Sequence, residues 1–269
     1  MSLKILVSTP LPMEDGPHGR RIGRPTFEWL KARLDLVTPL TTSLVPRWDY
    51  GFPVDEARNF SAQAAIDAGC DYLFFIDWDV IPKPQSLHQL VMRAQSALDC
   101  DIFSGVYTSR HYDWPAPLVY VGPDQKVSYD WTAGDVLTSE EHDISGFGMG
   151  LALIRTSLFE RLSNTPEKPW FRSTETEMVR ETEDLWFIKR AMAEAGSKLM
   201  VDTALLAWHI DPKTGTAYNL PPDSAPIVRW REKAGLGPNM VPYDMSAVMR
   251  ARIGQQVGDC SELPPGARL

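Results

Sequence analysis

The sequence predicts an α/β fold, in which helices flank a layered sheet within a single large domain. Three observations predict this class. Apolar runs alternate with segments of helical periodicity through the first 107 residues. One run, Tyr72–Ile76, shows no alternation of polar and apolar residues, as expected for a parallel strand covered on both faces. The 269 residues suit one large domain or two small ones, and 43% of them are hydrophobic, which is ordinary for a folded protein.

The first predicted elements are a strand, a long loop and two helices. The β-branched run Lys4–Ser8 predicts a buried strand, and the charged segment Leu11–Arg24 predicts the loop. A helix is expected to begin at Pro25, because apolar residues then recur at helical spacing: Phe27, Leu30 and Leu34. The second helix has Asp55 as its expected N-cap, ends at Gly69 and places four residues on one face: Ala57, Phe60, Ala64 and Ala68.

The remaining elements follow the apolar run Tyr72–Ile76. The next helix is predicted to bury Leu87, Leu90, Val91 and Ala94, and strands are expected at Ile102–Tyr107 and Leu151–Arg155. A hairpin is expected around Gly122-Pro123-Asp124. A further helix ends at Gly196 and is marked by Leu185, Ile188, Met192 and Ala195. The last predicted helix carries Met245, Val248, Met249 and Ile253 on one face.

Composition argues against several classes of protein. The 27 Lys and Arg residues are outnumbered by 35 Asp and Glu residues, and a net charge of −8 disfavours a broad nucleic-acid surface. The three cysteines form no CxxC pair, so neither a disulfide framework nor a zinc site is expected. Pro10 and Pro12 interrupt the N-terminal apolar stretch, and no apolar run approaches the ~20 residues of a membrane span. We therefore expect a cytoplasmic chain without a transmembrane segment.

Asp77 and Asp79 are the strongest candidates for chemistry. They directly follow the apolar strand, at the end where ligands bind in open α/β sheets. If strand geometry continues, the spacing of two directs both carboxylates to one side, where they converge on one hard cation. A solvated turn is the alternative, and Pro82 and Pro84 suit it.

Three more titratable residues are candidates. His209 lies in an apolar, strand-like setting and either adds a nitrogen ligand to the cation site or is a hydrogen-bonded core histidine. Glu183 and Asp184 open a helix, where the positive end of the helix dipole stabilises a carboxylate. The ordinary preference of first turns for acidic residues is the alternative for this pair.

Other patterns leave two interpretations each. The glycines at 146, 148 and 150 do not match the GxGxxG fingerprint, so NAD or FAD binding is not expected, but they permit close approach of a ligand or a strand. Arg58 is either a phosphate-binding cation or a surface arginine. The polar and aromatic segment 110–114 either faces a bound ligand or is a surface loop. Two interpretations are open for four tryptophans: the ring stacks on a sugar or base, or it lies in the core. We expect at least half of them to lie in the core. They are Trp78, Trp114, Trp131 and Trp186.

Taken in order, these pieces resemble one family, the nucleotide-sugar-dependent glycosyltransferases of the GT-A fold, and especially their inverting group with a DxD and an ED motif. The resemblance covers roughly residues 3 to 210. The matching pieces are Val7-Ser8-Thr9-Pro10, Ala57-Arg58-Asn59, Tyr72-Leu73-Phe74-Phe75-Ile76-Asp77-Trp78-Asp79, Gly148-Met149-Gly150-Leu151-Ala152-Leu153-Ile154-Arg155, Glu183-Asp184-Leu185-Trp186-Phe187 and Trp208-His209.

The resemblance implies a Rossmann-type mixed sheet and a division of the chain. Residues 1–210 would form the catalytic domain, with a nucleotide-binding half at 1–110 and an acceptor and catalytic half at 111–210. Residues 211–269 would form a C-terminal loop and helix extension. The implied partners are a UDP or GDP sugar and an acceptor that bears a hydroxyl group.

The resemblance also implies roles for individual residues. Asp77, Asp79 and His209 would hold a divalent metal, Mn²⁺ in the first instance and Mg²⁺ as the alternative. Asp184 would be the general base, with Glu183 beside it in the catalytic motif. Around the nucleotide would lie Thr9, Pro10, Arg58, Asp77, Trp78 and Gly148.

Two other functions compete with this interpretation. A buried strand that ends in DxD also resembles the haloacid-dehalogenase-type phosphatases, in which the first Asp, here Asp77, is the nucleophile. A non-catalytic module that binds a nucleotide sugar or glycan is the second alternative, with Glu183-Asp184 serving only as a helix cap.

Overall fold

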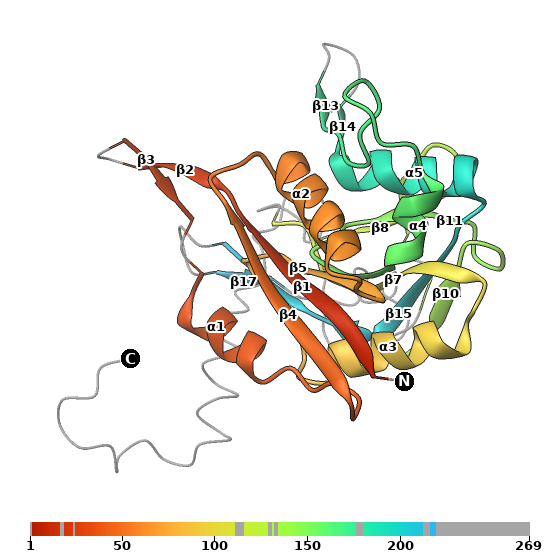
Figure 1. Cartoon of the computed structure of the whole chain (residues 1–269), viewed down its shortest axis with the longest axis horizontal. Coiled ribbons are helices and arrows are strands. Elements are labelled where there is room, and N and C mark those ends of the chain that lie inside the picture. The colour runs from red at the N-terminus through yellow and green to blue at the C-terminus, as the bar shows by residue number, and fades with distance from the viewer. Residues whose placement is uncertain are drawn as a thin grey trace, which may run out of the picture.

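A mixed seven-stranded sheet organises the fold (Figure 1). This computed structural model describes residues 2–16, 19–23, 25–110, 116–128, 131, 134–175, 180–211 and 216–218. Five strands run in one direction: β4 (Thr42–Tyr50), β1 (Leu3–Leu11), β5 (Tyr72–Ile76), β7 (Cys100–Val106) and β15 (Lys198–Leu206). The opposite direction is taken by β12 (Leu151–Arg155), between β5 and β7, and by β10 (Val136–Thr138), at the edge.

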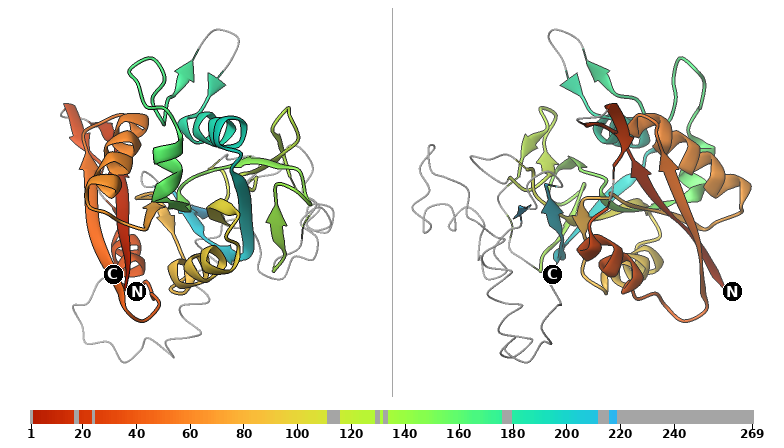
Figure 2. Two further views of the ribbon diagram at one scale, coloured as in Figure 1. Left: turned by 45° about the vertical axis from the view of Figure 1, so that its right-hand side comes forward. Right: turned by 90° about the vertical axis from the view of Figure 1, so that its left-hand side faces the viewer.

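Helices cover both faces of this sheet. The face with Leu73 and Phe75 packs against α2 (Val54–Asp67), α4 (Thr156–Arg161) and α5 (Glu183–Ala195). The face with Phe74 and Ile76 packs against α1 (Phe27–Leu34) and α3 (Ser86–Ser96). In the left view of Figure 2, α3 (yellow) lies below the sheet and α4 and α5 (green to teal) lie above it. Strand β5 is therefore covered on both sides, which explains its unbroken apolar sequence.

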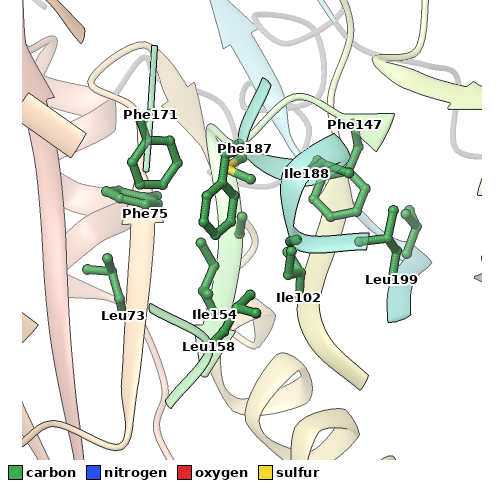
Figure 3. Packing of buried hydrophobic residues seen from close by; sticks show 14 of the residues in the cluster. Leu73, Phe75, Ile102, Phe147, Ile154, Leu158, Phe171, Phe187, Ile188 and Leu199 are labelled. Carbon is green, nitrogen blue, oxygen red and sulfur yellow. The ribbon is translucent and has the colours of Figure 1, made fainter. Parts of the chain in front are cut away.

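Stacked aromatic rings fill the space between β5 and α5. The rings of Phe171 and Phe187 are stacked with their centroids 4.4 Å apart, and Phe75 meets Phe171 edge to face at 5.7 Å (Figure 3). Such pairs stabilise a fold beyond the burial of their area. The packing fixes the first turn of α5 relative to the end of β5.

Small sheets surround the central one. The first hairpin pairs β2 (Met13–Gly16) with β3 (Gly19–Ile22), and the second pairs β13 (Thr174–Glu175) with β14 (Arg180–Glu181). A three-stranded sheet contains β8 (Val119–Val121), β9 (Lys126–Val127) and β11 (Ile144–Phe147). Another contains β6 (Val80–Ile81), β16 (Trp208–Ile210) and β17 (Ala217–Tyr218), and it joins the chain after β5 to the chain after β15.

The predicted α/β class, with a mixed sheet flanked by helices in one domain, is confirmed. The strand Leu151–Arg155 has its predicted bounds, and α3 buries all four predicted residues. The hairpin around residues 122–124 forms between β8 and β9. Helix α5 ends before Gly196, whose φ of +61° is the left-handed conformation typical of a helix end.

Three predictions of local structure were wrong. The expected loop Leu11–Arg24 contains the hairpin of β2 and β3. Helix α2 begins at Val54, so Asp55 lies inside it, and the Asp55 carboxylate accepts a hydrogen bond from the Ser173 amide at 2.9 Å instead of capping the helix. In α1 the predicted periodic residues face solvent while Trp29 on the opposite side is buried; the exposed residues are Phe27, Leu30 and Leu34.

Two predictions concern residues beyond the described ranges. The last helix, with Met245 and Ile253, lies outside them, as does almost all of the predicted extension 211–269. The division at residue 210 stays a prediction. Among the helices that the structure describes, none combines the length and the apolar character needed to cross a membrane.

Candidate active site

A cavity of about 280 Å³ opens where β5 and β1 end. The carboxyl ends of parallel strands are the usual place for ligands in α/β sheets. Its lining residues are Pro10, Pro12, Phe52, Val54, Asp77, Trp78, Asp79, Tyr107, Arg110, Leu118, Glu183 and His209. The fold thus brings four of the predicted chemical residues, which come from three distant parts of the sequence, to one cavity: Asp77, Asp79, Glu183 and His209.

A buried arginine organises the inner end of the site. Arg58, on α2, is 2% exposed, and its Nη2 lies 3.1 and 3.2 Å from the two carboxylate oxygens of Asp77. Its Nε donates to Glu183 Oε1 at 3.2 Å. Burial alone would lower the pKa of Arg58, but the carboxylates of Asp77 and Glu183 raise it above its ordinary value. Arg58 is therefore a fixed positive charge between two acids.

The two aspartates of the DxD segment have different partners. Strand β5 ends at Ile76, and the Val80 amide donates to the Asp77 carbonyl at 3.0 Å, which closes a turn. The indole Nε1 of Trp29 donates to the same carbonyl at 2.6 Å. Both carboxylates line the cavity, but Asp77 pairs with Arg58 while Asp79 faces His209. Burial raises the pKa of Asp77, and the nearby Arg58 partly offsets that effect.

Asp79 and His209 form a carboxylate–imidazole pair. His209 Nδ1 lies 2.6 Å from the Thr108 carbonyl oxygen, which only accepts hydrogen bonds, so this nitrogen carries the proton. In neutral His209 the lone pair of Nε2 then faces Asp79 Oδ2, 3.4 Å away. Two acceptors this close repel each other unless a positive charge lies beside them. Arg110 supplies such a charge, since its Nη1 lies 2.9 Å from the same oxygen.

The donor atoms of Asp79 and His209 are of the types that bind divalent cations. A carboxylate oxygen beside an imidazole nitrogen suits an ion such as Mn²⁺ better than Mg²⁺, which prefers oxygen alone. The hydrogen bond from His209 Nδ1 to a backbone carbonyl is the usual support of a metal-binding histidine. Within the described residues, however, no group of three or more His, Cys, Asp or Glu side chains is arranged to hold a metal ion. Asp79 and His209 alone would therefore supply two of the ligands of such an ion.

The two acids of the ED motif occupy different environments. Glu183 lines the cavity and is 8% exposed, and burial raises its pKa to about 7 although Arg58 opposes the shift. Asp184 is not among the lining residues. Its Oδ1 accepts hydrogen bonds from the Leu185 amide, at 2.8 Å, and from the Thr182 hydroxyl. Of the two, Glu183 is the carboxylate that a ligand in the cavity would meet.

Two glycines of the glycine-spaced segment, Gly148 and Gly150, permit the packing of one tyrosine. The Gly150 amide donates to the Tyr107 hydroxyl at 2.9 Å, and a methyl group at Gly148 would overlap that hydroxyl. The Tyr107 ring meets the His209 ring edge to face, with centroids 5.2 Å apart. The close approach that Gly148 permits is thus that of a side chain, and through it the segment supports His209.

The other predicted nucleotide-binding residues are spread around this cavity. Pro10 and Trp78 line it. Thr9 is fully buried, and its hydroxyl accepts a hydrogen bond from Arg33 Nη1 at 3.1 Å. Sequence reasoning assigned no role to Tyr107 or Phe52, which also line the cavity. Neither belongs to a motif: Tyr107 is the last residue of a predicted strand, and Phe52 follows β4, a strand that was not predicted.

Comparisons with known proteins bear on the fold. No model of a known protein family matches the chain, and a search of curated proteins gave no significant match. Among solved structures, the crystal structure of A197 from STIV matches 90% of this chain and 97% of that chain, with a TM-score of 0.52 and 17% identity. The structure of CMP:2-keto-3-deoxy-manno-octonic acid synthetase complexed with CTP matches 93% of this chain and 99% of that chain, with a TM-score of 0.40 and 11% identity. At such identities the likeness to A197 shows a shared α/β fold and nothing about activity.

Proposed function

We propose that this chain is a cation-dependent glycosyltransferase that moves a sugar from a nucleoside-diphosphate sugar to an acceptor hydroxyl with inversion. One observation carries the proposal. A buried carboxylate whose pKa burial raises to about 7, Glu183, lines the same cavity as the Asp79–His209 pair. A transfer of this kind needs a base at the acceptor and a positive charge at the leaving group.

Glu183 is the general base in this proposal. It accepts the proton of the acceptor hydroxyl, whose oxygen forms a bond to the anomeric carbon while the bond from that carbon to the diphosphate breaks. A base whose pKa lies near the working pH is well suited to this step, which contributes ~10²–10⁴-fold to the rate. The sequence motif assigns the base to Asp184, and we prefer Glu183 because it lines the cavity.

Asp79 and His209 hold the cation in this proposal. The cation, when bound, stabilises the negative charge that develops on the departing diphosphate. Asp77 and Arg58 have a different role, because the carboxylate of Asp77 is already paired with Arg58. They hold the turn and Glu183 in place. The apolar side of the cavity, with Pro10, Pro12 and Phe52, is the proposed place of the nucleoside.

The two alternatives gain less support. A phosphatase would use Asp77 as nucleophile, yet both oxygens of this carboxylate lie against Arg58 Nη2, which withdraws their electron density. In a module that only binds its ligand, Glu183 would serve as a helix-end residue and as the partner of Arg58, whereas here its carboxylate also lines the cavity.

Calorimetric titration tests the proposal. UDP and GDP are titrated into the metal-free chain with and without Mn²⁺, and into Asp79→Ala. Asp101→Ala is the matched control, because Asp101 is equally buried and pairs with a half-exposed arginine, Arg161, but does not line the cavity. Mn²⁺-dependent binding of one nucleotide, lost in Asp79→Ala and kept in Asp101→Ala, is the expected result. Binding of neither nucleotide to the unmodified chain would refute the assignment.

A further inference from the structure

Arg110 occupies the place of a cation at Asp79. Its Nη1 lies 2.9 Å from Asp79 Oδ2, the same oxygen that His209 Nε2 approaches at 3.4 Å. Asp79 is buried, with a side chain that is 8% exposed, while the side chain of Arg110 is 40% exposed and lines the cavity. The carboxylate is therefore neutralised by a residue whose side chain is open to solvent and to a ligand in the cavity.

Arg110 and a divalent cation compete for this oxygen. A cation bound by Asp79 Oδ2 and His209 Nε2 would lie against the guanidinium group, and two positive charges in contact repel strongly where water is scarce. A carboxylate that already has an arginine partner also binds a metal ion less well, because that pair must first be broken. Arg110 must therefore leave Asp79 before the pair with His209 is available to a cation.

The chemistry of arginine indicates where the side chain then binds. A guanidinium group carries its donors in a planar fork that matches phosphate, and it remains charged at every physiological pH. Arg110 is already on the cavity wall, two residues after Thr108, which fixes His209 through its carbonyl. The diphosphate of a bound donor is the anion that would meet it there.

We propose that Arg110 is an exchangeable counter-ion: it neutralises Asp79 in the cation-free chain, yields that oxygen to the divalent cation, and then binds the donor diphosphate. This inference rests on the proposed function for the diphosphate and on the Asp79–His209 pair for the cation. It predicts that Arg110 weakens cation binding in the absence of nucleotide and strengthens nucleotide binding once the cation is present.

Calorimetry with Mn²⁺ alone tests the first half. Arg110→Gln is compared with the unmodified chain and with the control variant Arg93→Gln. Arg93 is also a half-exposed arginine, and its Nε lies 2.8 Å from Oδ2 of a buried aspartate, Asp202. Because Arg93 does not line the cavity, this control removes the same charge away from the site. The expected result is Mn²⁺ binding about tenfold tighter in Arg110→Gln and unchanged in Arg93→Gln. Equal or weaker Mn²⁺ binding in Arg110→Gln overturns the inference, and so does the absence of binding in all three chains.

Nucleotide titration at saturating Mn²⁺ tests the second half. UDP or GDP is expected to bind Arg110→Gln about tenfold more weakly than the unmodified chain and Arg93→Gln. Equal affinity in all three overturns the diphosphate role. If no chain binds either nucleotide while Arg110→Gln still binds Mn²⁺ more tightly, the glycosyltransferase proposal and the diphosphate role fail, and the competition at Asp79 stands.

Discussion

Glu183 and Arg58 are 125 residues apart in the sequence, yet Arg58 Nε donates to Glu183 Oε1 at 3.2 Å inside the fold. The same guanidinium group binds Asp77 through Nη2. Because Arg58 stays charged, a proton taken up by Glu183 raises the net charge of this group of three side chains by one. The proposed base, Glu183, thus shares its surroundings with one fixed positive charge and a second carboxylate.

Replacement of Glu183 by Gln separates the two acids of the ED motif. Glu183→Gln keeps the shape of the side chain and removes its basicity, so we expect sugar transfer to fall by ~10²–10⁴-fold. The affinity for nucleotide and Mn²⁺ should change little, since neither proposed ligand residue is altered. The measurement is the rate of nucleoside-diphosphate release from the donor sugar that the chain accepts, beside calorimetry of nucleotide binding.

Asp184→Asn is the matched comparison. The Asp184 carboxylate accepts hydrogen bonds from Thr182 and from the Leu185 amide in the first turn of α5, and the amide oxygen of Asn can still accept them. The variant loses only the negative charge near the helix N-terminus, so we expect a loss of ~0.3–1 kcal/mol in stability and little change in the transfer rate. A large loss of transfer in Asp184→Asn with normal turnover in Glu183→Gln would return the base to Asp184, as the sequence motif assigns it.

The raised pKa of Glu183 predicts how stability depends on pH. Burial raises this pKa from an ordinary 4.5 to about 7 in the folded chain. Between these values Glu183 is protonated to a greater extent in the folded chain than in the unfolded chain, so its contribution to the free energy of unfolding falls as the pH rises from 4.5 to 7. Glu183→Gln lacks this contribution. Urea unfolding across that range should show the variant gaining stability relative to the unmodified chain as pH rises, whereas parallel profiles would contradict the assigned pKa.

The sequence predicts the parts of the fold whose burial is complete. Strand β5 and helix α3 have core faces that show as apolar runs or helical periodicity, and both are found where they were expected. Strand β4 was missed because it is an edge strand with alternating exposure and a proline, Pro46, which an edge tolerates. In α1 the periodic apolar residues face outward, so periodicity identified the helix and not its buried side.

The sequence predicts the candidate site less completely. Asp79 and His209 were expected together, and β6 and β16 pair to bring them together. Pro82 and Pro84 allowed for a turn after β5, but the pairing of Asp77 with Arg58 was not foreseen, because the partners of the two carboxylates depend on tertiary packing. The environments of Glu183 and Asp184 also depend on tertiary packing, which adjacent positions in a motif do not reveal.

Removal of Arg58 should destabilise the fold strongly. Arg58→Met leaves the buried carboxylate of Glu183 and the partly exposed carboxylate of Asp77 without their cation, and breaking a buried pair costs ~3–5 kcal/mol. If the cost comes from uncompensated charge, the double variant Arg58→Met/Glu183→Gln should lose less stability than the sum of the two single variants. Urea unfolding at pH 8 measures all three chains. Strict additivity would show that Arg58 acts through packing alone.

Gly148→Ala tests whether the glycine-spaced segment supports the cation site through Tyr107. A Cβ at this position would lie 2.9 Å from Tyr107 Cζ and overlap the hydroxyl, so the ring must shift, at a cost of ~1–3 kcal/mol. Because that ring packs edge to face on His209, we also expect Mn²⁺ to bind more weakly. Gly196→Ala is the control, since its φ of +61° makes the substitution strained while no neighbouring atom lies within 4 Å. Both variants should melt earlier than the unmodified chain, and only Gly148→Ala should lose Mn²⁺ affinity in calorimetry. If the two bind Mn²⁺ equally well, the packing of Tyr107 stabilises the fold and has no bearing on His209.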